Sequence, residues 1–162
     1  MQTYFTSDLH LLHKNIPKYR SVINSTQEND EFMLHKLSLL GKRDLLWVLG
    51  DFIFDSPDYN KIVSQIKSMP FQLKLVMGNH DSRQLYHSFT EQIQLPLISY
   101  KNKWISHCPV HPDEMRFRDG NIHGHLHSGT LNDERYFNVN IDVNNFEFVP
   151  LELINQHFNK DI

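Results

Sequence analysis

The sequence predicts a single α/β domain, and three features of the 162-residue chain support this fold class. Short apolar runs rich in β-forming residues recur in the first half of the chain. Segments with helical periodicity separate these runs, and alternating apolar residues follow in the second half. Because a chain of this length fits one domain, we expect residues 1–162 to form one folded unit.

The first half contains three predicted strands, at Gln2 to Ser7, Leu45 to Leu49 and Gln72 to Met77. Each run ends in a cluster of polar residues. Strands that alternate with helices form parallel sheets through right-handed crossovers. The expected order of this half is therefore β-α-β-α-β.

Two amphipathic helices connect these strands. The first spans Thr26 to Leu40, and Gly41 is placed as its C-terminal stop. The second begins with Ser56 as N-cap and Pro57 in the first turn. Its apolar face consists of Tyr59, Ile62, Val63, Ile66 and Met69.

The second half follows a different pattern. Leu97 to Ser99 and Trp104 to His107 flank three polar residues and predict a β-hairpin. Apolar and polar residues alternate from Phe137 to Val143, as in a half-exposed strand. We expect Phe146 to Val149 to pair back onto that strand, before a short helix from Leu151 to Phe158.

Composition narrows the possible partners. With 16 Lys and Arg against 19 Asp and Glu, the net charge of -3 argues against tight binding to long nucleic acid. A small anionic substrate remains possible.

The single cysteine cannot form an internal disulfide, and the N-terminus lacks the features of a secretory signal. No apolar run is long enough for a membrane span. We therefore expect a cytoplasmic protein; its oligomeric state stays open.

Polar residues that can bind metals follow each of the predicted strands. In α/β sheets, ligands collect beyond the carboxyl ends of the strands, so these residues are expected to meet at one rim. In chain order they are Asp8 and His10, then Asp51, then Asn79, His80 and Asp81, then His107, and finally His125 and His127.

The donor types indicate a pair of divalent ions. Carboxylate, imidazole and amide groups without thiolates suit Mn, Fe, Zn or Ni, with manganese favoured, whereas structural zinc sites are rich in cysteine. Seven of these residues are candidate ligands, namely Asp8, His10, Asp51, Asn79, His107, His125 and His127. Seven ligands are too many for one tetrahedral ion and instead fit two ions that share a bridge. Gly50, Gly78 and Gly124 stand just before ligands, where a tight turn or a close approach favours a residue without Cβ.

Together these motifs resemble those of the calcineurin-like metallophosphoesterases. The family set DxH, GDxx, GNH(D/E), a lone His and GHxH is matched in order. The segment Asn138 to Asp142, followed by Phe148 to Leu151, resembles the tail of the small bacterial and phage branch. The resemblance covers Thr3 to about Phe158 and implies a four-layer α-β-β-α sandwich with a dimetal centre on loops at one edge.

The resemblance also implies a role for each residue. Each metal would have four ligands, with Asp51 as the bridge: Asp8, His10, Asp51 and His127 for one ion, and Asp51, Asn79, His107 and His125 for the other. His80 would contact the substrate phosphate and protonate the leaving oxygen, with Asp81 holding its ring. The nucleophile would be a metal-bound hydroxide, since a metal lowers the pKa of its water.

The sequence departs from the family pattern at two positions. The common second carboxylate of GDxxD is displaced, because Asp55 stands one position late, and we leave it out of the site. His107 is followed by Cys108 where the family often has glycine. We expect Cys108 to be a small buried residue and no nucleophile.

Several other residues allow two interpretations. His13 either lines the pocket or lies in a solvated loop. Four arginines either grip phosphate in a bidentate manner or are solvated, namely Arg20, Arg83, Arg116 and Arg118. His123 is expected to point away from the rim. The remaining histidines interpreted as structural or exposed are His35, His87 and His157.

The sequence thus predicts an enzyme that hydrolyses a small, nucleotide-like phosphomonoester or phosphodiester with two divalent ions. One alternative is a nuclease acting on DNA or RNA, which the length and the charge of -3 disfavour. Another is a catalytically silent scaffold that binds proteins, but such scaffolds typically lose ligands and none is missing here.

Overall fold

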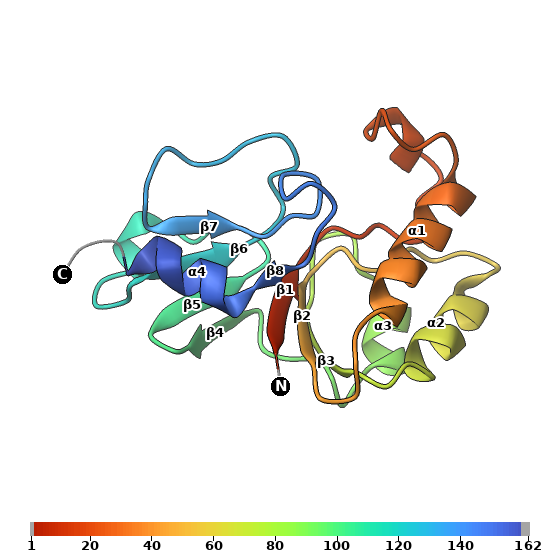
Figure 1. Cartoon of the computed structure of the whole chain (residues 1–162), viewed down its shortest axis with the longest axis horizontal. Coiled ribbons are helices and arrows are strands. Elements are labelled where there is room, and N and C mark those ends of the chain that lie inside the picture. The colour runs from red at the N-terminus through yellow and green to blue at the C-terminus, as the bar shows by residue number, and fades with distance from the viewer. Residues whose placement is uncertain (1, 160–162) are drawn as a thin grey trace.

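The computed structural model describes residues 2–159 as two four-stranded sheets packed face to face and flanked by helices (Figure 1). The strand orders are β3-β2-β1-β8 in the first sheet and β4-β5-β6-β7 in the second. The predicted α/β class and the sandwich architecture are confirmed. Within residues 2–159, no helix combines the length and apolar character needed to span a bilayer.

The first sheet is built from the three strands expected in the first half. β1 (Thr3–Thr6), β2 (Leu45–Leu49) and β3 (Gln72–Val76) run parallel, with Thr3 opposite Leu45 and Leu45 opposite Gln72. The fourth strand, β8 (Val149–Pro150), pairs antiparallel with β1. The expectation that Phe146 to Val149 pairs with the preceding segment is therefore wrong.

Helices cover one face of this sheet. α1 (Thr26–Ser38) begins after Ser25, whose hydroxyl accepts the Glu28 N–H. α2 (Tyr59–Lys67) and α3 (Arg83–Ser88) follow β2 and β3. The start predicted for α2 is two residues early, because Ser56 accepts the Asp58 N–H in a turn before the helix. The core beneath these helices includes Met33, Leu37, Leu46, Val48, Ile62, Ile66, Leu75 and Leu85.

The second sheet begins with the predicted hairpin, β4 (Leu97–Tyr100) and β5 (Lys103–Ser106), and continues with β6 (Gly120–His123) and β7 (Tyr136–Asn138) in parallel. Its inner face packs against the other face of the first sheet. The core between the sheets includes Phe5, Trp47, Leu49, Val76, Ile105, Ile122 and Val149. α4 (Leu151–Phe158), the expected C-terminal helix, adds Ile154 to this core.

The outer face of the second sheet is covered by segment 108–119, which contains a short 3-10 turn, η2 (Pro112–Glu114). The Trp104 indole donates to the Glu114 carbonyl at 2.8 Å, and the Tyr136 hydroxyl donates to the Val110 carbonyl at 2.6 Å. Arg118 lies over the Trp104 ring, 4.8 Å from its centroid. This outer layer is therefore thin compared with the helices on the first sheet.

The alternating segment from Phe137 to Val143 is a strand only as far as Asn138. Asn138 Oδ1 accepts the Asn140 N–H at 2.9 Å, and Asn140 Oδ1 accepts the Asp142 N–H at 2.8 Å. Asparagine side chains that capture nearby main-chain groups turn the backbone away from a ladder. The prediction of a strand through Val143 is wrong for this reason.

Candidate metal centre

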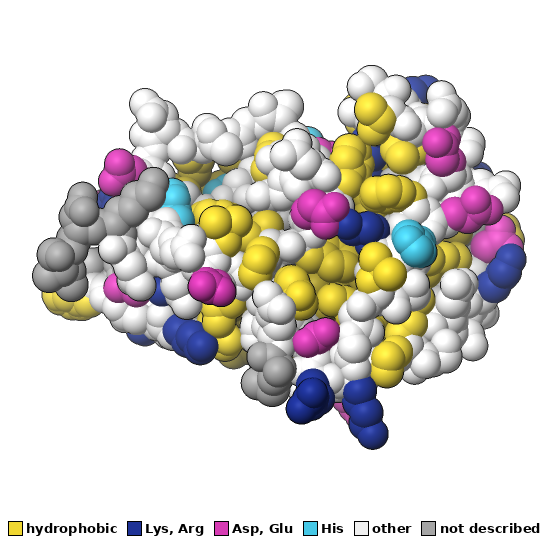
Figure 2. Space-filling model, viewed as in Figure 1, with side chains coloured by type: hydrophobic (Ala, Val, Ile, Leu, Met, Phe, Trp, Pro, Cys, Tyr) yellow, Lys and Arg dark blue, Asp and Glu magenta, His cyan; other side chains and the backbone are white. Residues whose placement is uncertain are grey.

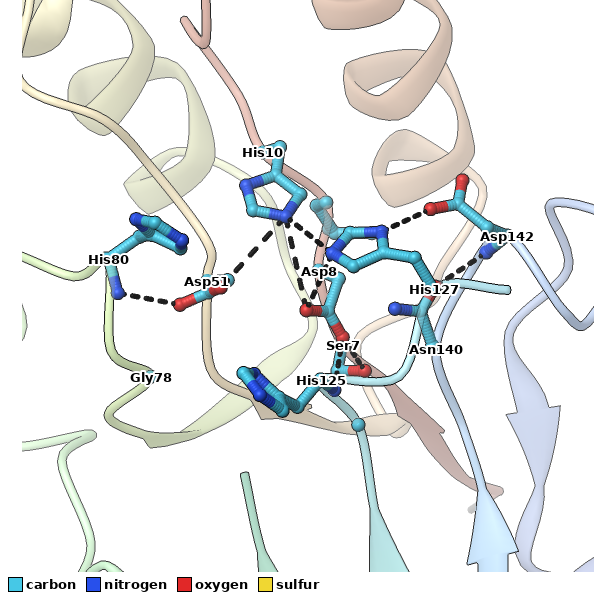
Figure 3. Close-up of polar contacts among 12 residues, drawn as sticks. Ser7, Asp8, His10, Asp51, Gly78, His80, His125, His127, Asn140 and Asp142 are labelled. Carbon is cyan, nitrogen blue, oxygen red and sulfur yellow. Dashed lines mark hydrogen bonds and ion pairs between the residues drawn. The ribbon is translucent and has the colours of Figure 1, made fainter. Parts of the chain in front are cut away.

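The predicted ligands converge where the strands of both sheets end. Asp8 and His10 follow β1, Asp51 follows β2, and the remaining ligands follow β3, β5 and β6. Main-chain hydrogen bonds tie these loops together, from Asp8 N–H to the Gly50 carbonyl at 2.9 Å and from His10 N–H to the Asp51 carbonyl at 3.0 Å. In Figure 3 the side chains drawn from separate segments point toward one another.

Several of the predicted metal-ligand residues have a left-handed backbone conformation, which is uncommon outside glycine. The φ angles are 60° at Asp8, 49° at His10, 54° at Asp51 and 68° at His125. Such conformations cost free energy and collect at functional sites. Gly50 also has a left-handed φ of 87°. These left-handed residues lie in the segments that follow β1, β2 and β6.

One group of donors consists of Asp8, His10 and His127. The Nε2 atoms of His10 and His127 lie 3.1 Å apart. The Oδ1 atom of Asp8 is 3.4 Å from the His127 Nε2 atom and 3.9 Å from the His10 Nε2 atom. This Oδ1 atom is buried and has no hydrogen-bond partner among the described residues. Three donor atoms therefore lie close together, and the Asp8 Oδ1 atom among them is left without a hydrogen bond.

A second group surrounds His107. Its Nε2 atom lies 2.9 Å from Asn79 Oδ1 and 3.6 Å from Asp51 Oδ2. The His125 ring is next to it, with ring centroids 5.1 Å apart. Asp51 Oδ2 also lies 3.9 Å from the His10 Nε2 atom. Asp51 therefore stands between the two groups, as a bridging carboxylate must.

The protonation of these residues favours cation binding. Burial, with His127 and Arg20 nearby, lowers the pKa of His10 to about 2, so its imidazole is neutral and offers a lone pair. Burial raises the pKa of Asp8. Because a buried carboxylate oxygen without a hydrogen bond is costly, a divalent ion would relieve the cost at Asp8 Oδ1. The donor set of carboxylate, imidazole and amide groups fits hard or borderline divalent ions.

Hydrogen bonds on the side away from the site set the orientation of two predicted ligands, Asp8 and His107. The Ser7 hydroxyl and the His125 N–H, the latter at 2.9 Å, donate to Asp8 Oδ2, which leaves Oδ1 free for a cation. His107 Nδ1 lies 2.7 Å from the Leu49 carbonyl, so its Nε2 atom faces the site. Gly78 allows a close approach, because a Cβ there would lie 2.2 Å from Asp51 Oδ1.

A buried network that sequence reasoning missed supports His127. Asp142 Oδ2 lies 2.7 Å from His127 Nδ1, and Arg20 Nε donates to Asp142 Oδ1 at 2.6 Å. The Arg20 guanidinium also donates to the Asp8 carbonyl at 2.6 Å and to Asn29 Oδ1 at 2.6 Å. Hydrogen bonding to Asp142 raises the pKa of His127. Burial raises the pKa of Asp142, but hydrogen bonds from His127 and Arg20 outweigh it and hold that pKa low.

A sequence model of the family described as calcineurin-like phosphoesterase matches residues 1–161. The chain belongs to this family. As a calcineurin-like phosphoesterase it is a metal-dependent phosphoric ester hydrolase, and the family uses two metals. Among the described residues, the donor clusters that could hold a metal ion are Asp8, His10 and His127, then Asp8, Asp51 and His107, and finally His107, Cys108 and His125.

Curated relatives come from a phage and from bacteria. The Gene 66 protein of Mycobacterium phage L5 is 29% identical, and the alignment covers 78% of this chain and 77% of that protein. A symmetrical bis(5′-nucleosyl)-tetraphosphatase of Buchnera aphidicola is 33% identical over 50% of this chain. This calcineurin-like phosphoesterase matches only 24% of the length of that tetraphosphatase.

Two solved structures resemble the chain. A protein of unknown function from Aquifex aeolicus has a TM-score of 0.71 and 25% identity, covering 96% of this chain and 98% of its own. The nuclease MPE of Pseudomonas putida has a TM-score of 0.52 and 21% identity, covering 77% of this chain and 60% of its own. The likeness to the nuclease shows the fold alone.

In this calcineurin-like phosphoesterase, His80 lies at the edge of the donor groups. Its side chain is exposed, its ring centroid is 6.0 Å from that of His10, and its N–H donates to Asp51 Oδ1 at 2.9 Å. Asp81 does not hold the His80 ring as expected. The Asp81 carboxylate instead accepts three main-chain N–H groups, from Asp51 at 2.9 Å, Phe52 at 2.8 Å and Gly78 at 2.7 Å. It therefore fixes the loops that carry Asp51 and Asn79.

The arginines do not form a phosphate-binding cluster. Arg20 is buried within the network behind His127, so the expectation that it is either a phosphate grip or a solvated residue is wrong. Arg118 stacks on Trp104 at the outer face of the second sheet. Arg83 and Arg116 are exposed.

Some of the other candidates from the sequence lie at the site and others lie away from it. His13 lines a cavity beside the donor groups, and Asp55 lies apart, accepting the Ser82 hydroxyl at 2.6 Å. Cys108 is exposed, which contradicts the expectation of burial, and its sulfur lies near His107 and His125.

His123 is buried against Tyr136 on the outer face of the second sheet. Of the remaining histidines, His35 and His87 are exposed and His157 is half-buried.

Proposed function

We propose that the chain hydrolyses a small, nucleotide-like phosphomonoester or phosphodiester, using two divalent ions bridged by Asp51. The observation that carries the proposal is the position of Asp51 Oδ2, 3.9 Å from His10 Nε2 and 3.6 Å from His107 Nε2. One carboxylate oxygen thus faces both donor groups. Two ions sharing a bridge are the arrangement that clamps a phosphoryl group during in-line displacement.

This geometry supports the two ligand sets that the family resemblance implies. One ion would be held by Asp8, His10, Asp51 and His127, and the other by Asp51, Asn79, His107 and His125. When bound, the ions supply Lewis acidity toward the phosphoryl oxygens. Manganese is our first expectation, with Fe, Zn or Ni as the other metals that suit mixed oxygen and nitrogen donors.

His80 would contact the phosphate and protonate the leaving oxygen. Two observations support this role. Its side chain is exposed beside the cavity that adjoins the ligands, and its backbone is fixed by the hydrogen bond to Asp51. A general acid needs to be accessible to substrate and held near the reacting group. Asp81 would act as a positioning residue for this loop through its three main-chain contacts.

The net charge of the chain and the name of one relative support a small substrate. The chain carries more acidic than basic residues, and its arginines form no stripe for a nucleic-acid backbone among the described residues. A curated relative is named for hydrolysing bis(5′-nucleosyl) tetraphosphates, which are small anionic nucleotides. Such a substrate agrees with the cytoplasmic location expected from the single cysteine. Nuclease activity is the second candidate and would require binding to long chains.

Activity assays with defined substrates test the proposal. The metal-loaded chain would be assayed with phosphomonoesters, linear diesters, cyclic nucleotides, dinucleoside polyphosphates and duplex DNA, each with Mn, Fe, Zn and Ni. We expect turnover of a small ester that disappears with a chelator and returns with metal. Exclusive cleavage of long DNA, or hydrolysis unaffected by chelation, would contradict the proposed function.

A further inference from the structure

A cavity of about 630 Å³ adjoins the proposed metal centre on one side. His10, His80 and His127 line it at the end nearest the donor groups. Its other walls come from the segment 13–22, which we call the arm, and from Phe146. The arm contains the 3-10 turn η1 (Ile16–Lys18) and stands out above α1 in Figure 1. The cavity is therefore open both to the metal ligands and to solvent.

The arm is held firmly at its base. Ile16 is 2% exposed, and Arg20 is 3% exposed with its guanidinium in the network that reaches Asp142 and Asn29. The Thr26 hydroxyl donates to the His13 carbonyl at 3.2 Å. These contacts fix the backbone on which the neighbouring exposed residues stand.

Two apolar side chains on this fixed arm are exposed. Tyr19 is 74% exposed and Val22 is 64% exposed, and both line the cavity. Figure 2 shows hydrophobic side chains gathered on this part of the molecule. Apolar side chains held on a rigid support beside a reactive centre mark a ligand-binding surface, because their exposure contributes nothing to folding.

Phe146 also lines the cavity, and its backbone conformation there costs free energy. Its φ of 60° is rare for a bulky residue. Its N–H donates to the Ile141 carbonyl at 3.0 Å, and the Arg20 guanidinium lies 5.7 Å from its ring centroid. The Phe32 ring contacts it edge-on, at 5.8 Å between centroids. The ring is thus held in one orientation at the cavity wall.

The cavity combines aromatic walls with weakly polar groups. His13 lies 6.4 Å from Tyr19 between ring centroids, and Ser21 and Ser128 add hydroxyl groups to the lining. Asp142 also lines it, but its charge is paired with Arg20 and His127. An uncharged planar ring with polar edges matches this lining better than an alkyl chain or an ion.

We propose that this cavity binds the nucleobase of the substrate whose phosphate lies at the metal centre. The proposal rests on the proposed function, which it deepens by naming the group esterified to the phosphate. Tyr19 and Phe146 would contact the faces of the base, as aromatic side chains do in other nucleotide sites. The two serine hydroxyls would be available to its polar edge.

Two ligands that differ only in the base test the proposal. Inhibition constants of adenosine 5′-monophosphate and ribose 5-phosphate would be measured from initial rates of nitrophenyl phosphate hydrolysis by the metal-loaded chain. We expect the adenine compound to bind about ten- to a hundredfold more tightly, the range that one stacked base provides. The ratio should fall toward one in Tyr19→Ala and stay at the wild-type value in Phe117→Ala, which removes a ring that is 95% exposed elsewhere.

The possible results separate the two proposals. Hydrolysis of the reporter with equal inhibition by both compounds would overturn the nucleobase site and leave the proposed function intact. No hydrolysis of any phosphoester would contradict the proposed function, and the two affinities would then be compared by calorimetry. A ratio unchanged by Tyr19→Ala, or hexyl phosphate binding as tightly as the adenine compound, would also overturn this inference.

Discussion

Asp142 Oδ2 lies 2.7 Å from His127 Nδ1, so this imidazole is held on one side while its Nε2 atom faces Asp8. The same carboxylate accepts the Arg20 Nε–H at 2.6 Å. A carboxylate behind a metal-binding histidine fixes the tautomer and the ring orientation. The Arg20 and Asp142 pair therefore supports the proposed metal centre from behind.

This relationship predicts the effect of Asp142→Asn. Losing the carboxylate behind His127 should lower metal affinity at the site that contains His127 by about ten- to a hundredfold. Calorimetric titration of the metal-free protein with Mn²⁺ measures it. Asp133→Asn is the matched control, because Asp133 pairs with Arg135 at the surface. Equal affinities in both variants would rule out a supporting role for Asp142.

His80→Ala should keep both metals yet lose about a hundred- to ten-thousandfold in turnover, the range for removing a general acid. The loss should be smaller with a nitrophenol leaving group, which needs little protonation. His87→Ala, at an exposed histidine of α3, serves as the control. Equal losses on good and poor leaving groups would show that His80 binds phosphate without acting as an acid.

The sequence indicated that these donor residues would lie close together, because the signal is local. Asp8, Asp51 and Asn79 each follow a parallel strand, and the ends of such strands meet at one edge. The pairing of Arg20 with Asp142 spans 122 positions, and no spacing or periodicity indicates it.

Other errors arose where side chains hydrogen-bond to the backbone. The neighbour of His80, Asp81, was expected to hold its ring, but the carboxylate accepts three main-chain N–H groups from two loops. Asn138 and Asn140 likewise end a strand that apolar alternation continues to predict. Neither outcome depends on the pattern of apolar residues, so periodicity could not reveal it.

The metal-free protein should lose stability as the pH falls. His10 has a pKa of about 2 when folded, against an ordinary value of 6.5 for histidine, so below pH 6.5 the unfolded chain binds a proton that the folded chain does not. This difference lowers the free energy of unfolding by up to about 2 kcal/mol between pH 8 and pH 5. Chemical denaturation at several pH values, compared with His10→Asn, measures the contribution of this residue.

Comparison of variants removes the contributions of the other titrating groups. His35→Asn, which changes an exposed histidine of α1, should keep the wild-type pH dependence. His10→Asn should show a shallower decrease between pH 8 and pH 5. An identical decrease in wild type and His10→Asn would contradict the low pKa assigned to His10.

Long duplex DNA should be neither bound tightly nor processed. A protein that grips one phosphate through metals should show a slope of about one or less when the logarithm of affinity is plotted against that of salt concentration. Binding of duplex, single-stranded and mononucleotide ligands across a salt series measures the slope. Submicromolar duplex binding with a steep slope and accompanying cleavage would favour the nuclease alternative.

Metal stoichiometry, measured by elemental analysis of the loaded and desalted protein, tests the central claim most directly. We predict about two equivalents of divalent metal per chain. Asp51→Asn should lower occupancy at both sites, whereas Asp55→Asn should keep both, because Asp55 lies apart and accepts the Ser82 hydroxyl. Saturation at one equivalent in the wild type, or full occupancy and activity in Asp51→Asn, would contradict a dimetal centre bridged by Asp51.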